Sequence, residues 1–84
     1  MQKVINCAIH DYIEIACMYN YAINLELFTG SALQGKAKTT QTSKDKKEYL
    51  LLDCQQNVQK IELINIKKMT ALLPNPHFNS IDFS

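Results

Sequence analysis

AINLELFTGS, residues 22–31, is the stretch of this 84-residue sequence that decides the fold class. Ile23, Leu25 and Leu27 alternate with polar neighbours, and this period of two is typical of a strand with one buried face. The Thr-Gly-Ser that follows predicts a tight turn, because Gly30 reaches a positive φ without steric penalty. The stretch therefore predicts the first strand and turn of a β-rich domain.

Working outward toward the C-terminus, the pattern predicts four further short strands. Their expected ranges are 32–39, 48–54, 58–64 and 66–72. Gly35 inside the second strand predicts a bulge or a sharp bend, and the polar, lysine-rich residues 40–47 predict an exposed loop. Prolines at 74 and 76 end regular pairing, and the tail 73–84 is expected to add a short edge strand.

On the N-terminal side, the period changes from two to that of a helix. We expect a helix over residues 6–19, with Asn6 as its N-cap. Ile9, Tyr12, Ile13 and Ala16 share one face, with Cys17 at its margin. The opposite face carries His10, Asp11, Glu14 and Met18. The helix is thus amphipathic, and its apolar side must pack on the strands.

Together these elements predict one domain, residues 1–84, that is mainly β with a single N-terminal α-helix. Strands within 22–72 would form a small, bent antiparallel barrel of about five strands, since closure or strong bending protects sheet edges. Pattern alone leaves Sm-like, SH3-like and OB topologies open.

The bulk composition is that of an ordinary globular protein, with 46% hydrophobic residues and a net charge of +1. No apolar run approaches the roughly 20 residues that cross a bilayer, and no secretory signal is recognisable. We therefore expect a cytoplasmic protein that does not enter a membrane. Cys7, Cys17 and Cys54 are an odd set without metal-binding spacing, so we expect three reduced, mostly buried thiols and no metal.

Residues able to support catalysis are few. Cys7 and His10 lie three residues apart, but no third group orients the histidine. Asp11 and Glu14 are three residues apart on a solvated helix face, which does not offer the buried setting that a catalytic acid–base pair needs. No phosphate-binding or nucleotide-binding glycine motif occurs. We expect neither an enzyme nor a cofactor.

Two charged surfaces are candidates for binding. Residues 36–48 carry five lysines against two carboxylates, which suits either a solvated loop or a weak contact to nucleic acid or an acidic partner. All nine basic residues are lysine, and the missing arginine argues against a dedicated nucleic-acid reader. The outer helix face is acidic beside Met18 and Ile15, which suits either solvent or a basic partner surface.

Short motifs in fixed order resemble those of the Rho-binding antiterminators, the Rof family. They are Ile5-Asn6-Cys7, Glu14-Ile15-Ala16-Cys17, Leu25-Glu26-Leu27, Gly30, Leu33-Gln34, Lys36-Ala37, Glu48-Tyr49-Leu50 and Ile61-Glu62-Leu63. Each motif is short, but their combination is specific and spans the chain from about Val4 to the tail.

The resemblance implies an Sm-like fold and a function. Rof proteins bind the hexameric RNA helicase Rho, the transcription termination factor, at its primary RNA-binding region and keep RNA off it. The resemblance implies that Asp11 and Glu14 contact Rho, with His10 and Lys44 as further contacts. We expect a monomer when free, without direct RNA binding. The alternative is an Sm-like module that binds single-stranded RNA through the lysine-rich loop.

The sequence departs from the family's pattern directly after Cys7. Ala8 and Ile9 stand where relatives carry consecutive acids. We therefore expect Met18 and Ile15 to add apolar contacts to the binding of Rho.

Overall fold

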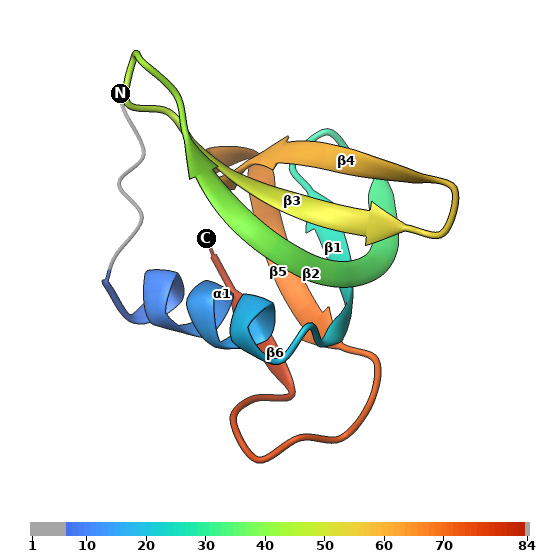
Figure 1. Cartoon of the computed structure of the whole chain (residues 1–84). Coiled ribbons are helices and arrows are strands. Elements are labelled where there is room, and N and C mark those ends of the chain that lie inside the picture. The colour runs from blue at the N-terminus through green and yellow to red at the C-terminus, as the bar shows by residue number, and fades with distance from the viewer. Residues whose placement is uncertain (1–6, 84) are drawn as a thin grey trace.

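The computed structural model describes residues 7–83, with side chains described from Ile9 onward. The helix α1 (Cys7–Met18) precedes a series of short strands (Figure 1). The strands are β1 (Ala22–Leu27), β2 (Ala32–Thr42), β3 (Glu48–Cys54), β4 (Asn57–Glu62), β5 (Ile66–Ala71) and β6 (Ser80–Asp82), and the 3-10 turn η1 (Leu63–Asn65) joins β4 to β5. The expected mainly β chain with an N-terminal helix is confirmed. Asn6, the expected N-cap, lies outside the described residues.

The six strands form one antiparallel sheet in the order β4-β3-β2-β1-β5-β6. The sheet is strongly bent, as expected, but it is not closed into a barrel, and the number of strands is six and not about five. The tail supplies the extra strand, since β6 pairs with β5 through Met69↔Ile81 and its neighbours. Because β5 has β1 on one side and β6 on the other, it cannot also pair with β4 to close the sheet.

The alternating strand residues supply the core. Ile23 and Leu25 of β1 are fully buried, as the period of two predicted. Buried apolar side chains from the helix, the strands and the tail form one cluster: Ile9, Ile13, Ala16, Ile23, Leu25, Ala37, Leu50, Leu52, Ile61, Leu63, Ile66, Met69, Phe78 and Phe83. Within the described residues, no helix is long and apolar enough to span a membrane.

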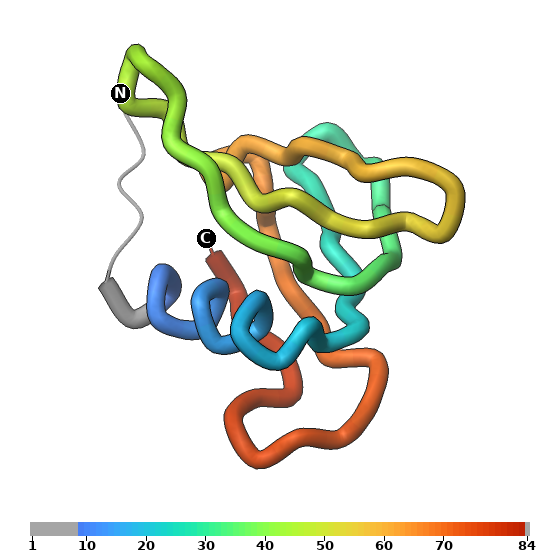
Figure 2. Tube along the Cα trace, viewed as in Figure 1, coloured from blue at the N-terminus to red at the C-terminus, as the bar shows by residue number. Residues whose placement is uncertain are grey.

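The segment between β5 and β6 loops away from the sheet and then returns behind α1 in the view of Figure 2. Phe78 holds the returning segment against the helix. Its ring packs edge-on against that of Tyr12 in α1, with the two ring centres 5.9 Å apart, and it is almost fully buried. Asn75 shapes the turn by accepting hydrogen bonds from the backbone N–H groups of His77 and Phe78. The tail is therefore part of the packing that holds α1 in place.

Gly35 of β2 lies against the backbone of Asp53 in β3. A Cβ at this position would lie 2.5 Å from the backbone oxygen of Asp53, so no larger residue fits without movement of β3. The expected bulge lies slightly further on, where the β2–β3 register shifts between Ala37 and Thr39. The glycine thus permits the close approach, and the shift that follows bends the strand.

We predict that Gly35→Ala lowers the free energy of unfolding by about 2 kcal/mol or more, because overpacking of this kind forces backbone shifts. Gly30→Ala is the matched control. A Cβ at Gly30 would have no atom within 4 Å, but the alanine must adopt a φ of 97°. That backbone conformation costs roughly 1 kcal/mol. Urea denaturation of both variants measures the difference, and a smaller loss at Gly35 than at Gly30 would contradict the steric explanation.

Candidate functional site

The exposed face of α1 is fixed by the packing of its opposite face. Ile13 and Ala16 are almost fully buried against the sheet, and Ile9 is 8% exposed. Because side chains on a helix repeat every 3.6 residues, Asp11 and Glu14 then point outward, and both are exposed. The orientation predicted from the sequence places the two carboxylates in solvent on one rigid element.

Asn20 ends the helix and ties it to the sheet. It adopts a left-handed backbone with a φ of 51°, which is common at helix C-termini. Its side-chain amide donates to the backbone oxygen of Ala37 on β2 at 2.9 Å and to that of Cys17 at 3.2 Å. This residue therefore fastens the C-terminal end of α1 to β2.

We expect Asn20→Ala to destabilise the protein by about 1–2 kcal/mol. The variant loses both side-chain hydrogen bonds, and alanine adopts a left-handed backbone less readily than asparagine does. Asn20→Gly loses the same hydrogen bonds but tolerates the backbone, so it should lose less. Chemical denaturation gives both values, and amide exchange along α1 shows whether the helix loosens. Equal losses would mean that the backbone conformation is irrelevant here.

His10 and Glu48 join the helix to the start of β3. His10 Nε2 lies 3.0 Å from Glu48 Oε2, and both side chains are partly exposed. This pair lines a small polar notch of about 180 Å³ between α1 and the β2–β3 ladder, which is lined by His10, Ile13, Glu14, Thr40, Gln41, Thr42, Glu48 and Leu63. Two carboxylates, two hydroxyls and an amide thus border one notch, an arrangement that suits a cationic group.

Lys44 is exposed and lies in the turn between β2 and β3, away from the helix. The turn is held by Ser43, whose hydroxyl donates to the carboxylate of Asp45 and accepts from the backbone N–H of Lys47 at 3.2 Å. The hydrogen bond from Ser43 is the main cause that lowers the pKa of Asp45. The turn therefore presents Lys44 on an ordered hairpin that also positions Glu48, the first residue of β3.

The cysteines described are not catalytic in character. Cys17 and Cys54 are free and half-buried, less buried than the sequence predicted. Burial, with a smaller contribution from Glu14, raises the pKa of Cys17 to about 11, so the thiol stays protonated at neutral pH. The side chain of Cys7 lies outside the described part. Among the described residues, no group of histidines, cysteines and acids could hold a metal ion.

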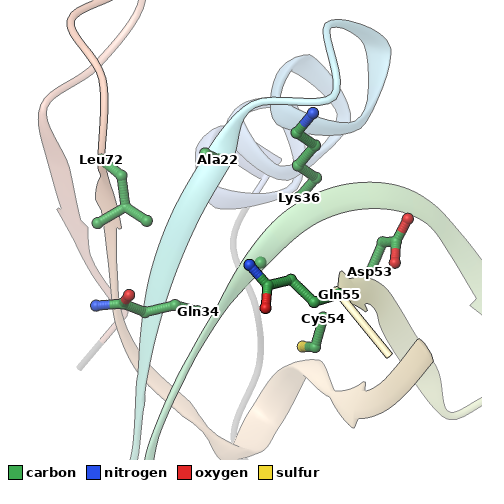
Figure 3. Close-up of a pocket in the computed structure, with 8 residues that line it drawn as sticks. Ala22, Gln34, Lys36, Asp53, Cys54, Gln55 and Leu72 are labelled. Carbon is green, nitrogen blue, oxygen red and sulfur yellow. The ribbon is translucent and has the colours of Figure 1, made fainter. Parts of the chain in front are cut away.

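A larger open hollow of about 720 Å³ lies on the outer face of the sheet, where it borders β1, β2 and the end of β3 (Figure 3). Lys36 and Asp53 on its rim are register partners, yet their side chains point apart. Burial raises the pKa of Cys54, which also lines it. No activated nucleophile faces this hollow, so its lining offers no catalytic arrangement.

Of the residues predicted from the sequence, three lie together. Asp11 and Glu14 are exposed on α1, and His10 lies half-buried at the margin of that face, in contact with Glu48 of β3. Lys44 lies on the separate β2–β3 turn. Sequence reasoning missed Glu48 and the threonines of β2 as members of this site. The sequence carries little indication of these residues, because only the pairing of Thr42 with Glu48 in the β2–β3 ladder brings them beside the helix.

Comparison with known proteins identifies a family for this chain. The family described as "Modulator of Rho-dependent transcription termination (ROF)" matches residues 4–83. A solved structure, YaeO bound to magnesium from Vibrio cholerae O395, is similar with 32% sequence identity and a TM-score of 0.83, and the match covers 88% of this chain and 96% of that one. No match was found among curated proteins. The family match over almost the whole chain shows that this chain belongs to the ROF family of modulators of Rho-dependent transcription termination.

Proposed function

We propose that this protein inhibits Rho-dependent termination by binding Rho at its primary RNA-binding region, where it blocks the loading of RNA. The observation that carries the proposal is the exposed acidic face of α1, on which Asp11 and Glu14 lie in solvent. A surface that binds RNA phosphates is basic, and a rigid acidic helix can occupy the same charged surface.

The neighbouring groups extend this surface. The notch beside Glu14 holds the carboxylate of Glu48 and the hydroxyls of Thr40 and Thr42, so it can accept a lysine or arginine side chain of the partner. His10 contributes an aromatic ring that its contact with Glu48 holds in place. Lys44 can pair with an acidic group beside the basic surface.

On this proposal the protein acts by occupancy alone, in the cytoplasm, without a cofactor and without chemistry of its own. Exposed apolar atoms near the carboxylates add to the contact. Met18, one helical turn beyond Glu14, is 71% exposed. Charge steers the encounter of the two proteins, and apolar contact slows their dissociation.

The direct test is competition for Rho. A labelled single-stranded RNA is bound to Rho, the purified protein is titrated in, and both the anisotropy of the RNA and the RNA-stimulated ATP hydrolysis are followed. We expect RNA to be released and ATP hydrolysis to fall in parallel. If the protein binds Rho while the affinity of Rho for RNA stays unchanged, competition is not the mechanism.

The same titration without Rho tests the RNA-binding alternative. The lysines of residues 43–47 share their turn with Asp45, and Lys47 Nζ lies 3.8 Å from Asp45 Oδ2. The carboxylate offsets part of the positive charge, so the turn is only weakly basic. We expect no change in the anisotropy of the RNA. Direct binding that weakens steeply with added salt would favour the RNA-binding module.

A further inference from the structure

The open sheet has two edges of very different character. β6 has three residues and follows a loop that contains two prolines, whereas β4 has six residues, Asn57–Glu62, and contains no proline. β4 pairs with β3 on one side only, and Figure 1 shows it at the margin of the sheet, away from α1. The backbone N–H and C=O groups on its free side can pair with another strand.

The side chains of this edge alternate in a regular way. Ile61 points into the core and is 6% exposed. Lys60 and Glu62, on either side of it, belong to the opposite face of the strand. Val58 lies on that same face and is 45% exposed, and Ile64 just beyond the strand is 40% exposed. The edge thus carries two exposed apolar residues that flank a lysine and a glutamate.

This order of residues is complementary to itself. In an antiparallel pair of two β4 strands related by a two-fold axis at Ile61, Lys60 of each copy stands opposite Glu62 of the other. The strand ends at Glu62, so residues 60–62 of the two copies face each other in this ladder, and Val58 of each copy lies toward the 3-10 turn η1 of the other, which contains the exposed Ile64. Opposite charges that face each other across antiparallel strands stabilise the pairing, and here the Lys60–Glu62 pair occurs twice.

We infer that β4 is a docking edge for a second copy of this chain, which forms a two-fold dimer with a continuous sheet. A contact between identical surfaces closes on itself and stops at two copies. Head-to-tail assembly of β4 onto β5 of another copy is blocked, because β6 already occupies that side of β5. This inference differs from the free monomer expected from the sequence, and the concentration series described below distinguishes the two.

Contacts within the chain hold the charged residues ready for this pairing. Lys60 Nζ lies 4.3 Å from the centre of the Tyr49 ring, and Tyr49 is also the ladder partner of Glu62 on β3. Both charged residues therefore border one ring on the outer face. Lys60 and Glu62 form no ion pair with each other in the described residues. Both charged groups can therefore form ion pairs with a second copy.

The test is a charge exchange followed by sedimentation equilibrium and light scattering from micromolar to millimolar protein. We expect the unaltered chain to form dimers as concentration rises. Lys60→Glu alone and Glu62→Lys alone should each weaken dimerisation by about tenfold or more, because each sets like charges opposite one another twice. A mixture of the two variants should form the heterodimer, and the double variant Lys60→Glu with Glu62→Lys should recover the affinity of the unaltered chain.

Lys67→Glu on β5 is the matched control, since Lys67 is exposed and lies outside the β4 edge; its dimerisation should match that of the unaltered chain. Circular dichroism of every variant confirms that it is folded. A monomer at all concentrations would overturn the inference, as would dimers that ignore the single reversals or a mixture that fails to associate. The inference is independent of Rho, and competition with RNA can succeed or fail without affecting it.

Discussion

Asp11→Lys combined with Glu14→Lys is expected to weaken binding to Rho by about tenfold or more, a change of roughly 1.4 kcal/mol or above. Both carboxylates are exposed on α1, and the basic surface proposed as their partner would meet two lysines in their place. The variant should also release RNA from Rho less effectively in the anisotropy titration. Its free energy of unfolding should change by only about 1 kcal/mol or less, because exposed charges contribute little to folding.

A matched control separates the helix face from overall charge. Glu26→Lys with Asp53→Lys changes the net charge by the same amount, and both of these residues are exposed on strands outside α1. We expect this control to bind Rho nearly as well as the unaltered protein. Equal losses for the two double variants would show that general charge governs binding and that the helix face is not specific.

Sequence patterns identified the elements that depend on local order. The alternation in residues 22–27 and the apolar run from Glu48 to Cys54 correspond to β1 and β3, because burial of one strand face leaves a visible period in the sequence. The two faces of α1 were predicted for the same reason. Lys44 and the two carboxylates were correctly placed in solvent, although their contact with Rho remains a proposal.

Features that depend on tertiary contacts were harder to predict. Residues 40–42 look like loop because they are polar, yet they extend β2 by pairing with β3. β6 has only three residues, too few to show a period, and its pairing with β5 is what leaves the sheet open. The contact between His10 and Glu48 joins residues 38 positions apart, and no sequence spacing indicates it.

Gly35 illustrates how a correct signal can have a different cause. The sequence indicated a bulge or a bend at this glycine. The structure places the register shift two residues later and shows that the glycine admits the backbone of Asp53. Glycine in a strand marks a bend and a close backbone approach equally well, and only the position of the neighbouring strand distinguishes the two.

Ile13→Asp should destabilise the protein severely, because Ile13 is only 1% exposed in the core between α1 and the sheet. Burying an unpaired carboxylate and removing the apolar contacts costs about 3 kcal/mol or more, a large part of the roughly 5 kcal/mol expected for so small a domain. Thermal unfolding followed by circular dichroism measures the loss.

Met18→Asp is the matched control. It places the same residue in the same helix at a position that is 71% exposed, and it should stay folded. The pair tests the orientation of α1 on which the acidic face depends: if Ile13→Asp were as stable as Met18→Asp, the helix could not present Asp11 and Glu14 to Rho as proposed.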